Sequence, residues 1–248
     1  MRNRPVPVMT DADKAFVHSL VIYEDAAVLA FNKPSGLPVQ SRGNKARCLD
    51  ELLWAFARSN GKRPRLVHRI DAGTSGLVIA AKTQPAAAFL SSAFEARRVV
   101  KRYVALASGI IPTADAGMVD APLLKLQQSD QPARSIIAPP DTEKAQAAQT
   151  RWAILARAQQ YALIEARPVT GRMHQIRAHF AHLGVPILGD PIYGGGEQTA
   201  SRLMLHAASL ELPHPDIQTL KLEAPVPSDF AALQTQLGLS LPGSAERI

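Results

Sequence analysis

The chain of 248 residues has a single cysteine, Cys48, and few aromatic residues, which make up 5% of the sequence. One cysteine cannot form a disulfide within the chain, so a disulfide scaffold is excluded and a reducing cytoplasm is expected. The scarcity of aromatic residues argues against a surface that stacks successive bases of single-stranded nucleic acid. The longest segment without a charged residue, 230–245, contains glutamine, serine, glycine and proline, so it is not a membrane span. The N-terminus has no apolar segment typical of a signal peptide.

Hydrophobic residues make up 46% of the chain and charged residues 20%, which is typical of a folded globular protein. Lysine and arginine total 28 against 21 aspartate and glutamate, a net charge of +7. This excess favours a polyanionic partner such as nucleic acid, but it says nothing about chemistry. No point divides the sequence cleanly. We therefore expect a flexible arm at 1–18, one domain at 19–238 and a tail at 239–248.

Hydrophobic periodicity and turn residues predict a mixture of helices and strands. Thr83 is an expected helix N-cap, with Pro85 in the first turn, and Ser228 could cap a last helix. Segment 110–150 has five prolines and predicts loops and short hairpins. The mixture lacks the regular alternation of a parallel sheet, so the fold class is α+β, with a mainly antiparallel sheet and flanking helices. Strands are expected at 20–23, 27–31, 76–81, 103–107, 150–155 and 161–166, and helices at 49–56, 84–94, 173–183 and 228–237.

The first chemically rich segment is His-Arg-Ile-Asp-Ala-Gly-Thr-Ser-Gly at 68–76. It places Asp71 in a glycine-bearing turn that leads into a buried strand. A carboxylate held by the backbone of a rigid element suits a nucleophile or a general base. Alternatively, Asp71, Thr74 and Ser75 are ordinary turn residues that bond their own backbone.

The second segment, 167–179, contains Thr-Gly-Arg-Met-His-Gln-Ile-Arg. Helical spacing puts Met173, Ile176 and Phe180 toward the core, and Arg172, Gln175 and His179 on another stripe. An arginine in the first turn opposes the helix dipole, which suggests pairing with a carboxylate or a phosphate. The alternative is a solvated polar face.

The third segment, 32–38, is a rigid loop with one cation, Lys33, at the end of a strand. It could contact phosphate or be a plain turn. Two other kinds of site are disfavoured. His174, His179 and His182 lack the i, i+4 spacing of a helical zinc pair, so no metal is expected. Ser75 lacks the Gly-x-Ser-x-Gly pattern of a serine hydrolase.

Together these segments resemble the RluA family of RNA pseudouridine synthases over residues 20–232. HRIDAGTSG is similar to that family's catalytic signature, with Ile70 in place of leucine, a volume-conserving change. The string TGRMHQIRAHFAHLGVPILGDPIYGG resembles the third motif, NKPSGL the first, and Lys101-Arg102-Tyr103 the second-motif lysine and tyrosine. The resemblance implies a pseudouridine synthase catalytic domain. About 18 residues precede the first strand, so we expect no separate N-terminal RNA-binding module.

The resemblance also implies roles. Asp71 would attack the uridine, Tyr103 would lie against the base and assist proton transfer, Arg172 would pair with Asp71, and Arg69 would fill the gap left by a flipped nucleotide. From the strand pattern alone, the Tyr103 ring could face either the core or a pocket. The reaction oxidises nothing and loses no group, so no cofactor is expected. Without an added module, scattered cations would bind the RNA: Lys33, Lys101, Arg102 and Arg177.

The expected substrate is structured RNA, either transfer RNA or large-subunit ribosomal RNA. The expected enzyme is an isomerase that acts as a monomer in the cytoplasm. Neither a membrane nor a metal is expected as a partner. A non-catalytic RNA-binding or RNA-folding protein is the alternative. Binding alone has no need of Asp71, Tyr103 and Arg172 together, which favours the enzyme.

Overall fold

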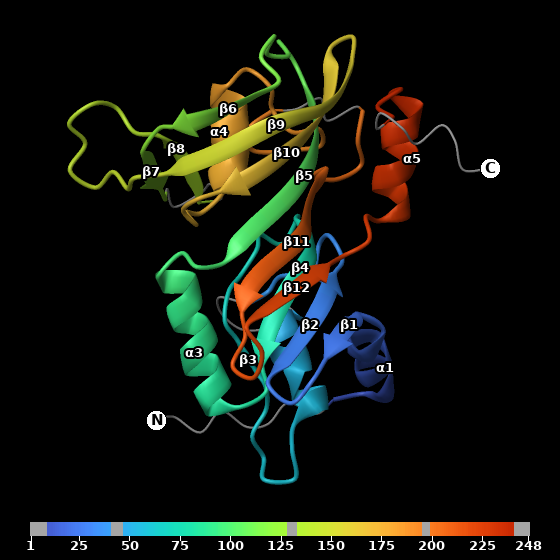
Figure 1. Cartoon of the computed structure of the whole chain (residues 1–248). Coiled ribbons are helices and arrows are strands. Elements are labelled where there is room, and N and C mark those ends of the chain that lie inside the picture. Colours follow the sequence, from blue (N-terminus) through green and yellow to red (C-terminus); the bar gives the residue numbers. More distant parts are fainter. Residues whose placement is uncertain (1–8, 41–46, 128–132, 195–198, 241–248) are drawn as a thin grey trace. The chain divides into compact units, whose positions relative to one another are not determined.

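A computed structural model describes residues 9–40, 47–127, 133–194 and 199–240. The chain forms two compact units, an N-terminal unit of Met1–Val99 and Ser209–Pro225 and a C-terminal unit of Val100–Ala208 and Val226–Ile248 (Figure 1). This division differs from the single domain expected at 19–238. The later part of the chain returns to the N-terminal unit, so no single point in the sequence separates the two.

The strands of the N-terminal unit are β1 (Val21–Glu24), β2 (Val28–Lys33), β3 (Arg65–Leu66) and β4 (Ser75–Ala81). All neighbouring pairs are antiparallel, and β4 lies between β2 and β3, because Ala80 and Ala81 pair with both. Every residue of β4 is buried, as its apolar sequence predicts. The segment that carries Asp71 connects β3 to this buried strand.

The helices of the N-terminal unit begin with α1 (Asp11–Ser19), where Thr10 and Asp13 form a reciprocal capping box. This helix corrects the expectation of a flexible arm for residues 11–18; residues 1–8 lie outside the described part. The helix expected at 49–56 is an α-helical turn, α2 (Leu49–Leu52), followed by a 3-10 turn, η1 (Leu53–Phe56). The Thr83 hydroxyl caps α3 (Gln84–Glu95), as predicted.

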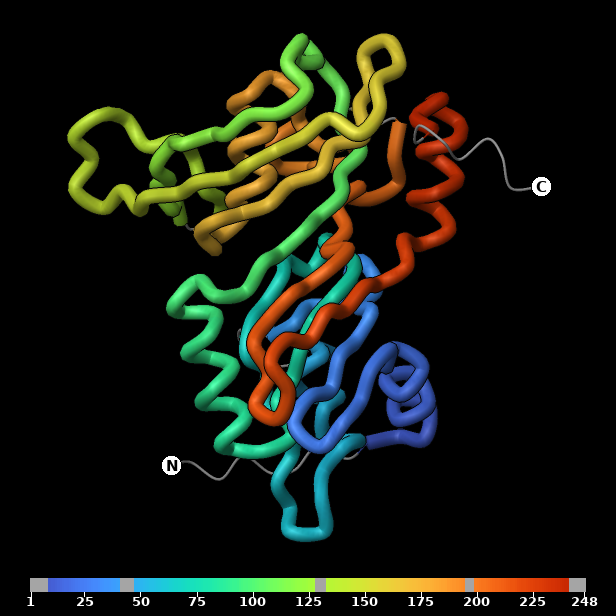
Figure 2. Tube along the Cα trace, viewed as in Figure 1, coloured from blue at the N-terminus to red at the C-terminus, as the bar shows by residue number. Residues whose placement is uncertain are grey.

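Two strands near the end of the sequence complete the N-terminal unit. The strand β11 (Leu205–Pro213) passes into it, and its second half pairs with β12 (Thr219–Glu223). In Figure 2 the orange and red hairpin rejoins the blue and green strands of this unit. This hairpin lies outside the strands expected from the sequence, although β12 alternates exposed and buried residues.

The C-terminal unit is built on β5 (Val100–Ser108), β6 (Ala116–Asp120), β9 (Gln149–Ala158) and β10 (Tyr161–Pro168). They form an antiparallel sheet in the order β5-β10-β9-β6. A separate hairpin joins β7 (Leu123–Leu126) to β8 (Arg134–Ile137), in the proline-rich segment where short hairpins are predicted. Helix α4 (Gln175–His182) contacts β8, β9 and β10 (Figure 1).

Two helix starts differ from expectation. The N-cap of α5 (Ser228–Gln236) is Pro227, so Ser228 is the first helical residue and not a cap. Helix α4 begins at Gln175 and not at 173, because its N-cap, His174, has the left-handed backbone conformation, with φ of 53°. Arg172 therefore lies in the loop before the helix and not in its first turn, so it does not oppose the helix dipole as expected.

Candidate active site

Asp71 lies in the loop between β3 and β4, at the turn that leads into the buried strand. Its carbonyl oxygen accepts a hydrogen bond from the Thr74 amide at 3.1 Å, so the turn interpretation is correct for its backbone. Along this loop Arg69 is exposed, Ile70 is buried and Asp71 is half-buried. The buried Ile70 side chain therefore anchors the loop between the exposed Arg69 and the half-buried Asp71.

The loop after β2 holds the Asp71 loop in place. The Lys33 side chain is fully buried, and its ammonium group donates to the carbonyl oxygens of Pro34 at 2.9 Å, Leu37 at 2.8 Å and Ala72 at 3.0 Å. A buried ammonium is stable only when its hydrogen-bonding groups are satisfied, and these three acceptors match its three N–H donors. The prediction that Lys33 contacts RNA is wrong, since the side chain has no exposed surface. Its task is to join two loops.

Two further hydrogen bonds strengthen this connection. The Ser35 hydroxyl donates to the Gly73 carbonyl at 2.7 Å, and the Gly36 amide donates to the Ala72 carbonyl at 2.8 Å. Gly36 has φ of 85°, a conformation that a residue with a side chain rarely adopts. The segment 32–38 therefore supports Ala72 and Gly73, the two residues that follow Asp71.

In the C-terminal unit, Lys101, Arg102 and Tyr103 lie on β5, and all three are partly buried. Tyr103 is paired with Ala166 of β10 and packs against the core of this unit. The Lys101 ammonium donates to the Thr170 carbonyl at 3.2 Å. Arg102 forms an ion pair with the buried carboxylate of Glu165. Lys101 and Arg102 thus both make contacts within the protein.

The loop that carries Arg172 is organised by Gln175, a buried residue at the start of α4. Its side-chain oxygen accepts from the Thr170 hydroxyl at 2.6 Å and from the Arg172 amide at 3.0 Å. Its amide group donates to the Gln149 carbonyl at 2.9 Å and to the Thr150 hydroxyl at 3.0 Å. All four interactions fix residues 170–172 against β9. The Arg172 side chain, which is half-buried, donates to the Ala147 carbonyl at 3.2 Å.

The solvated polar face suggested as the alternative for this helix is absent from it, since residues 175–180 are all buried. Both ring nitrogens of His179 have partners, the Thr150 hydroxyl at 2.9 Å and the Ala121 carbonyl at 3.0 Å. Burial lowers the pKa of His179, which favours the neutral ring. This histidine is a structural residue of the core. In the part of the chain that the structure describes, no three histidine, cysteine or acidic side chains are grouped so that they could hold a metal ion.

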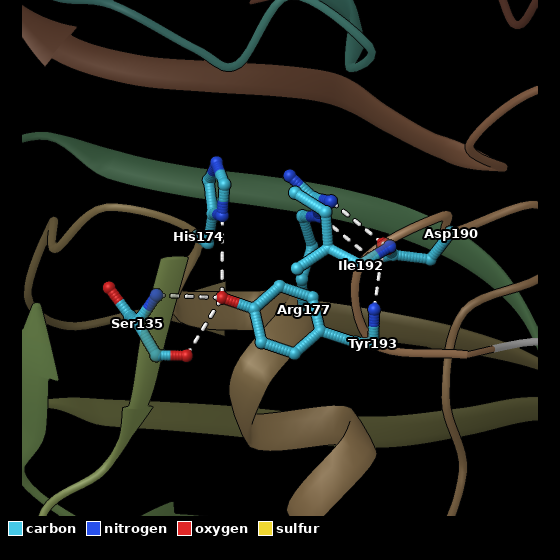
Figure 3. Close-up of polar contacts among 6 residues, drawn as sticks. All are labelled: Ser135, His174, Arg177, Asp190, Ile192 and Tyr193. Carbon is cyan, nitrogen blue, oxygen red and sulfur yellow. Dashed lines mark hydrogen bonds and ion pairs between the residues drawn. The ribbon is translucent and has the colours of Figure 1, made fainter. Parts of the chain in front are cut away.

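Arg177 is the second cation whose predicted contact with RNA is wrong. Its buried guanidinium forms a double hydrogen bond with Asp190, at 2.8 and 2.7 Å (Figure 3). Burial alone would raise the pKa of Asp190, but the Arg177 hydrogen bond and charge, with the amides of Ile192 and Tyr193, outweigh burial and lower it. The carboxylate stays ionised, and the pair fixes the loop after α4.

Tyr193 connects that loop to the β7–β8 hairpin. Its hydroxyl donates to the Ser135 carbonyl at 2.8 Å, accepts from the Ser135 amide at 2.9 Å, and lies 3.3 Å from Nδ1 of His174 (Figure 3). The Arg177 guanidinium lies over the Tyr193 ring, 5.2 Å from its centre. The Ser135 hydroxyl in turn donates to the carbonyl of Met173, the residue after Arg172, at 2.6 Å.

The structure therefore distributes the predicted site residues over both units. The N-terminal unit contains Asp71 and Arg69, and the C-terminal unit contains Tyr103 and Arg172. Sequence reasoning missed the residues that support them. The signal for Asp190 and Tyr193 was the Gly-Asp-Pro-Ile-Tyr-Gly string at 189–194, in which an acid and a tyrosine lie three residues apart, and Ser35 lies in the Asn-Lys-Pro-Ser-Gly-Leu string at 32–37. The supporting residues overlooked are Ser35, Ser135, Asp190 and Tyr193.

Comparison with known proteins agrees with these observations. The family model described as RNA pseudouridylate synthase matches residues 27–182. An uncharacterised RNA pseudouridine synthase of Zymomonas mobilis is 38% identical over 215 residues, which cover 86% of this chain and 96% of that protein. Ribosomal large subunit pseudouridine synthase C of Vibrio cholerae is 35% identical over 244 residues, covering 95% of this chain and 75% of that protein.

Among solved structures, human RNA pseudouridylate synthase domain containing 4 matches with a TM-score of 0.78 and 26% identity, over 93% of this chain and 98% of that one. The chain belongs to the RNA pseudouridylate synthase family, and its relatives confirm the resemblance to RluA-type enzymes. It is an RNA pseudouridine synthase, an isomerase with the mixed, mainly antiparallel α+β fold predicted from its sequence. No helix in the described ranges is long and apolar enough to span a membrane.

Proposed function

We propose that Asp71 is the nucleophile of this synthase and attacks a uridine of structured RNA. The observation that carries the proposal is that Asp71 is half-buried at the turn into β4, and that the two residues after it, Ala72 and Gly73, are held by hydrogen bonds from Lys33 and Ser35. A carboxylate needs to be ionised and held still to act as a nucleophile, and a rigid backbone provides the second condition. The guanidinium of Arg172 would favour the charged form during the reaction.

The isomerisation needs no added group. In the proposed reaction the Asp71 carboxylate bonds to C1′ of the ribose as the bond from N1 of uracil to C1′ breaks. The ring turns, and a bond from C5 to C1′ forms as the bond from Asp71 to C1′ breaks, which releases the carboxylate unchanged. The C5 position then loses its proton and N1 ends with one, so atoms and electrons balance without an oxidant. The hydroxyl of Tyr103 is proposed to move the C5 proton, an acid–base contribution of about 10²–10⁴ in rate.

Access to the base requires that the nucleotide leave its stack, which costs a few kcal/mol. Arg69 is proposed to occupy the space that the nucleotide leaves. Its side chain is exposed and lies two residues from Asp71, and a guanidinium plane stacks well on neighbouring bases. Lys101 and Arg102 are proposed to contribute to RNA binding, because both side chains are partly exposed.

The proposed substrate is large-subunit ribosomal RNA or transfer RNA. Several relatives are named as synthases of the ribosomal large subunit, among them synthase D of Pseudomonas aeruginosa at 34% identity. The ribosomal substrate is therefore the first to assay.

The test is Asp71→Asn, which keeps the size of the side chain and removes its charge. Pseudouridine formation should fall below detection, while affinity for RNA changes less than about tenfold, equivalent to roughly 1.4 kcal/mol. Asp115→Asn is the matched control, because Asp115 is an exposed surface residue paired with Arg157, and it should keep wild-type activity. Measurable pseudouridine formation by Asp71→Asn would contradict the assignment. Wild-type protein that binds RNA without isomerising any uridine would favour an RNA-folding protein instead.

A further inference from the structure

His68 opens the segment that carries Arg69 and Asp71. Its ring lies at the place where β3 leaves β4. The Val67 amide donates to the Ile79 carbonyl at 3.3 Å, as a regular antiparallel pair would require. The Ile79 amide, however, donates to Nε2 of the His68 ring at 2.9 Å. A side-chain nitrogen thus takes the position that a main-chain carbonyl of β3 would occupy in a continuing ladder.

Because the ring nitrogen of His68 takes the place of a main-chain carbonyl, the strand pairing ends here and the loop begins. Ile79 is fully buried, so its amide needs an acceptor. The imidazole ring supplies it, and the ring also stacks on Phe94 of α3, with 4.6 Å between centres and 16° between planes. Two independent contacts, one to a buried strand and one to a helix, therefore fix the His68 side chain three residues before Asp71.

The hydrogen bond also defines the protonation state of the ring. A nitrogen that accepts from an amide carries no proton, so the ring proton is on Nδ1 and the ring is neutral. An imidazolium would place an N–H group against the Ile79 amide. Glutamine can present an oxygen at about the position of Nε2, whereas phenylalanine keeps only the ring that stacks.

We infer that His68 is a positioning residue, which sets the place of Asp71 and Arg69 by accepting a hydrogen bond from Ile79 as a neutral ring stacked on Phe94. The inference rests on the proposed function, because its effect on the reaction passes through Asp71. This positioning role of His68, the first residue of the signature, is separate from reaction with the substrate and from contact with RNA.

The experiment compares His68→Phe with His68→Gln, using single-turnover pseudouridine formation, RNA affinity and thermal stability. His68→Phe should slow the single-turnover step at least tenfold while RNA affinity changes less than threefold. His68→Gln should recover most of that loss, because it restores the acceptor. His18→Phe is the matched control, since His18 also contacts an aromatic ring, Phe56, in the same unit but is exposed. It should keep the wild-type rate.

A rate for His68→Phe within twofold of wild type would overturn the inference, and so would equal slowing by both variants, which would remove the acceptor as the cause. If His68→Phe does not fold, ring-nitrogen NMR of the wild-type protein decides: a protonated Nδ1 and an unprotonated Nε2 support the inference, and the opposite tautomer overturns it. Activity of Asp71→Asn would instead show that the proposed function itself has failed.

Discussion

Each unit of this synthase uses one buried cation to hold a loop, but the two cations have different acceptors. In the N-terminal unit, the Lys33 ammonium donates to three main-chain carbonyls from two loops. In the C-terminal unit, the Arg177 guanidinium forms a paired hydrogen bond with the carboxylate of Asp190. An ammonium with three N–H donors suits acceptors that come from several directions, whereas the planar guanidinium fork suits a carboxylate.

The difference shows how two loops of similar function can depend on different physics. The loops beside Asp71 are held by the positions of carbonyl oxygens, so their support depends on backbone geometry. The loop after α4 is held by opposite charges, so its support depends on ionisation. Removing a partner should therefore cost most where a charge is left buried without its counterion.

The largest expected effect on stability follows from Asp190→Asn. The substitution leaves the Arg177 charge buried without its partner, and the free energy of unfolding should fall by about 3–5 kcal/mol. Urea denaturation measures the change. Asp229→Asn is the matched control, since Asp229 is half-exposed and pairs with Arg202, an interaction worth at most about 1 kcal/mol. Equal losses in the two variants would contradict the importance given to the buried pair.

The same pair predicts a pH dependence. Because the pKa of Asp190 is lowered from its usual 3.8, its contribution to stability is complete above that pH and is lost as the pH falls through the lower, folded value. The free energies of unfolding of the wild-type protein and of Asp190→Asn should therefore approach each other as the pH falls below 3.8. A difference that stays constant down to the most acidic measurable pH would show that the carboxylate charge is not responsible.

Lys33→Met should have the next largest effect, a loss of about 2–4 kcal/mol, because three carbonyl oxygens lose a charged donor. Pseudouridine formation should decrease as well, since Ala72 is the residue after Asp71. Lys82→Met removes a lysine that forms a surface ion pair with Glu24 and serves as the control. Lys33→Arg keeps the charge but changes its shape: a planar fork cannot reach the same three oxygens, so arginine should not restore stability. Full recovery by arginine would mean that only the charge matters.

The smallest of these effects is expected for Tyr193→Phe. The hydroxyl is lost, and the amide and carbonyl of Ser135 lose a partner, at a cost of about 1–3 kcal/mol. Tyr161→Phe is the control, because its exposed hydroxyl only accepts from Gln160. Thermal unfolding of both variants gives the difference. An unchanged melting temperature for Tyr193→Phe would show that its hydroxyl does not stabilise the hydrogen-bond network around Ser135 and Met173.

The sequence predicted the strands that are apolar throughout and the helix whose start is marked by Thr83 and Pro85. It also identified the segments that contain Asp71 and Arg172. It did not predict the burial of Lys33 and Arg177, because local pattern assigns charged residues to the surface, and only distant partners such as Ala72 and Asp190 make burial favourable. The polar stripe expected on helix α4 was wrong for the same reason. The helix is buried on nearly all sides, so its polar residues form hydrogen bonds within the core.

The proposed reaction assigns the nucleophilic attack to Asp71 of the N-terminal unit and the transfer of the C5 proton to Tyr103 of the C-terminal unit. The most direct test measures turnover and RNA affinity for Tyr103→Phe and Tyr103→Ala. If the ring stacks on the base and the hydroxyl moves a proton, Tyr103→Phe should bind RNA nearly normally and lose about 10²–10⁴ in rate. Tyr103→Ala should lose, in addition, about 1–3 kcal/mol of binding. Turnover of Tyr103→Phe at the wild-type rate would contradict this assignment.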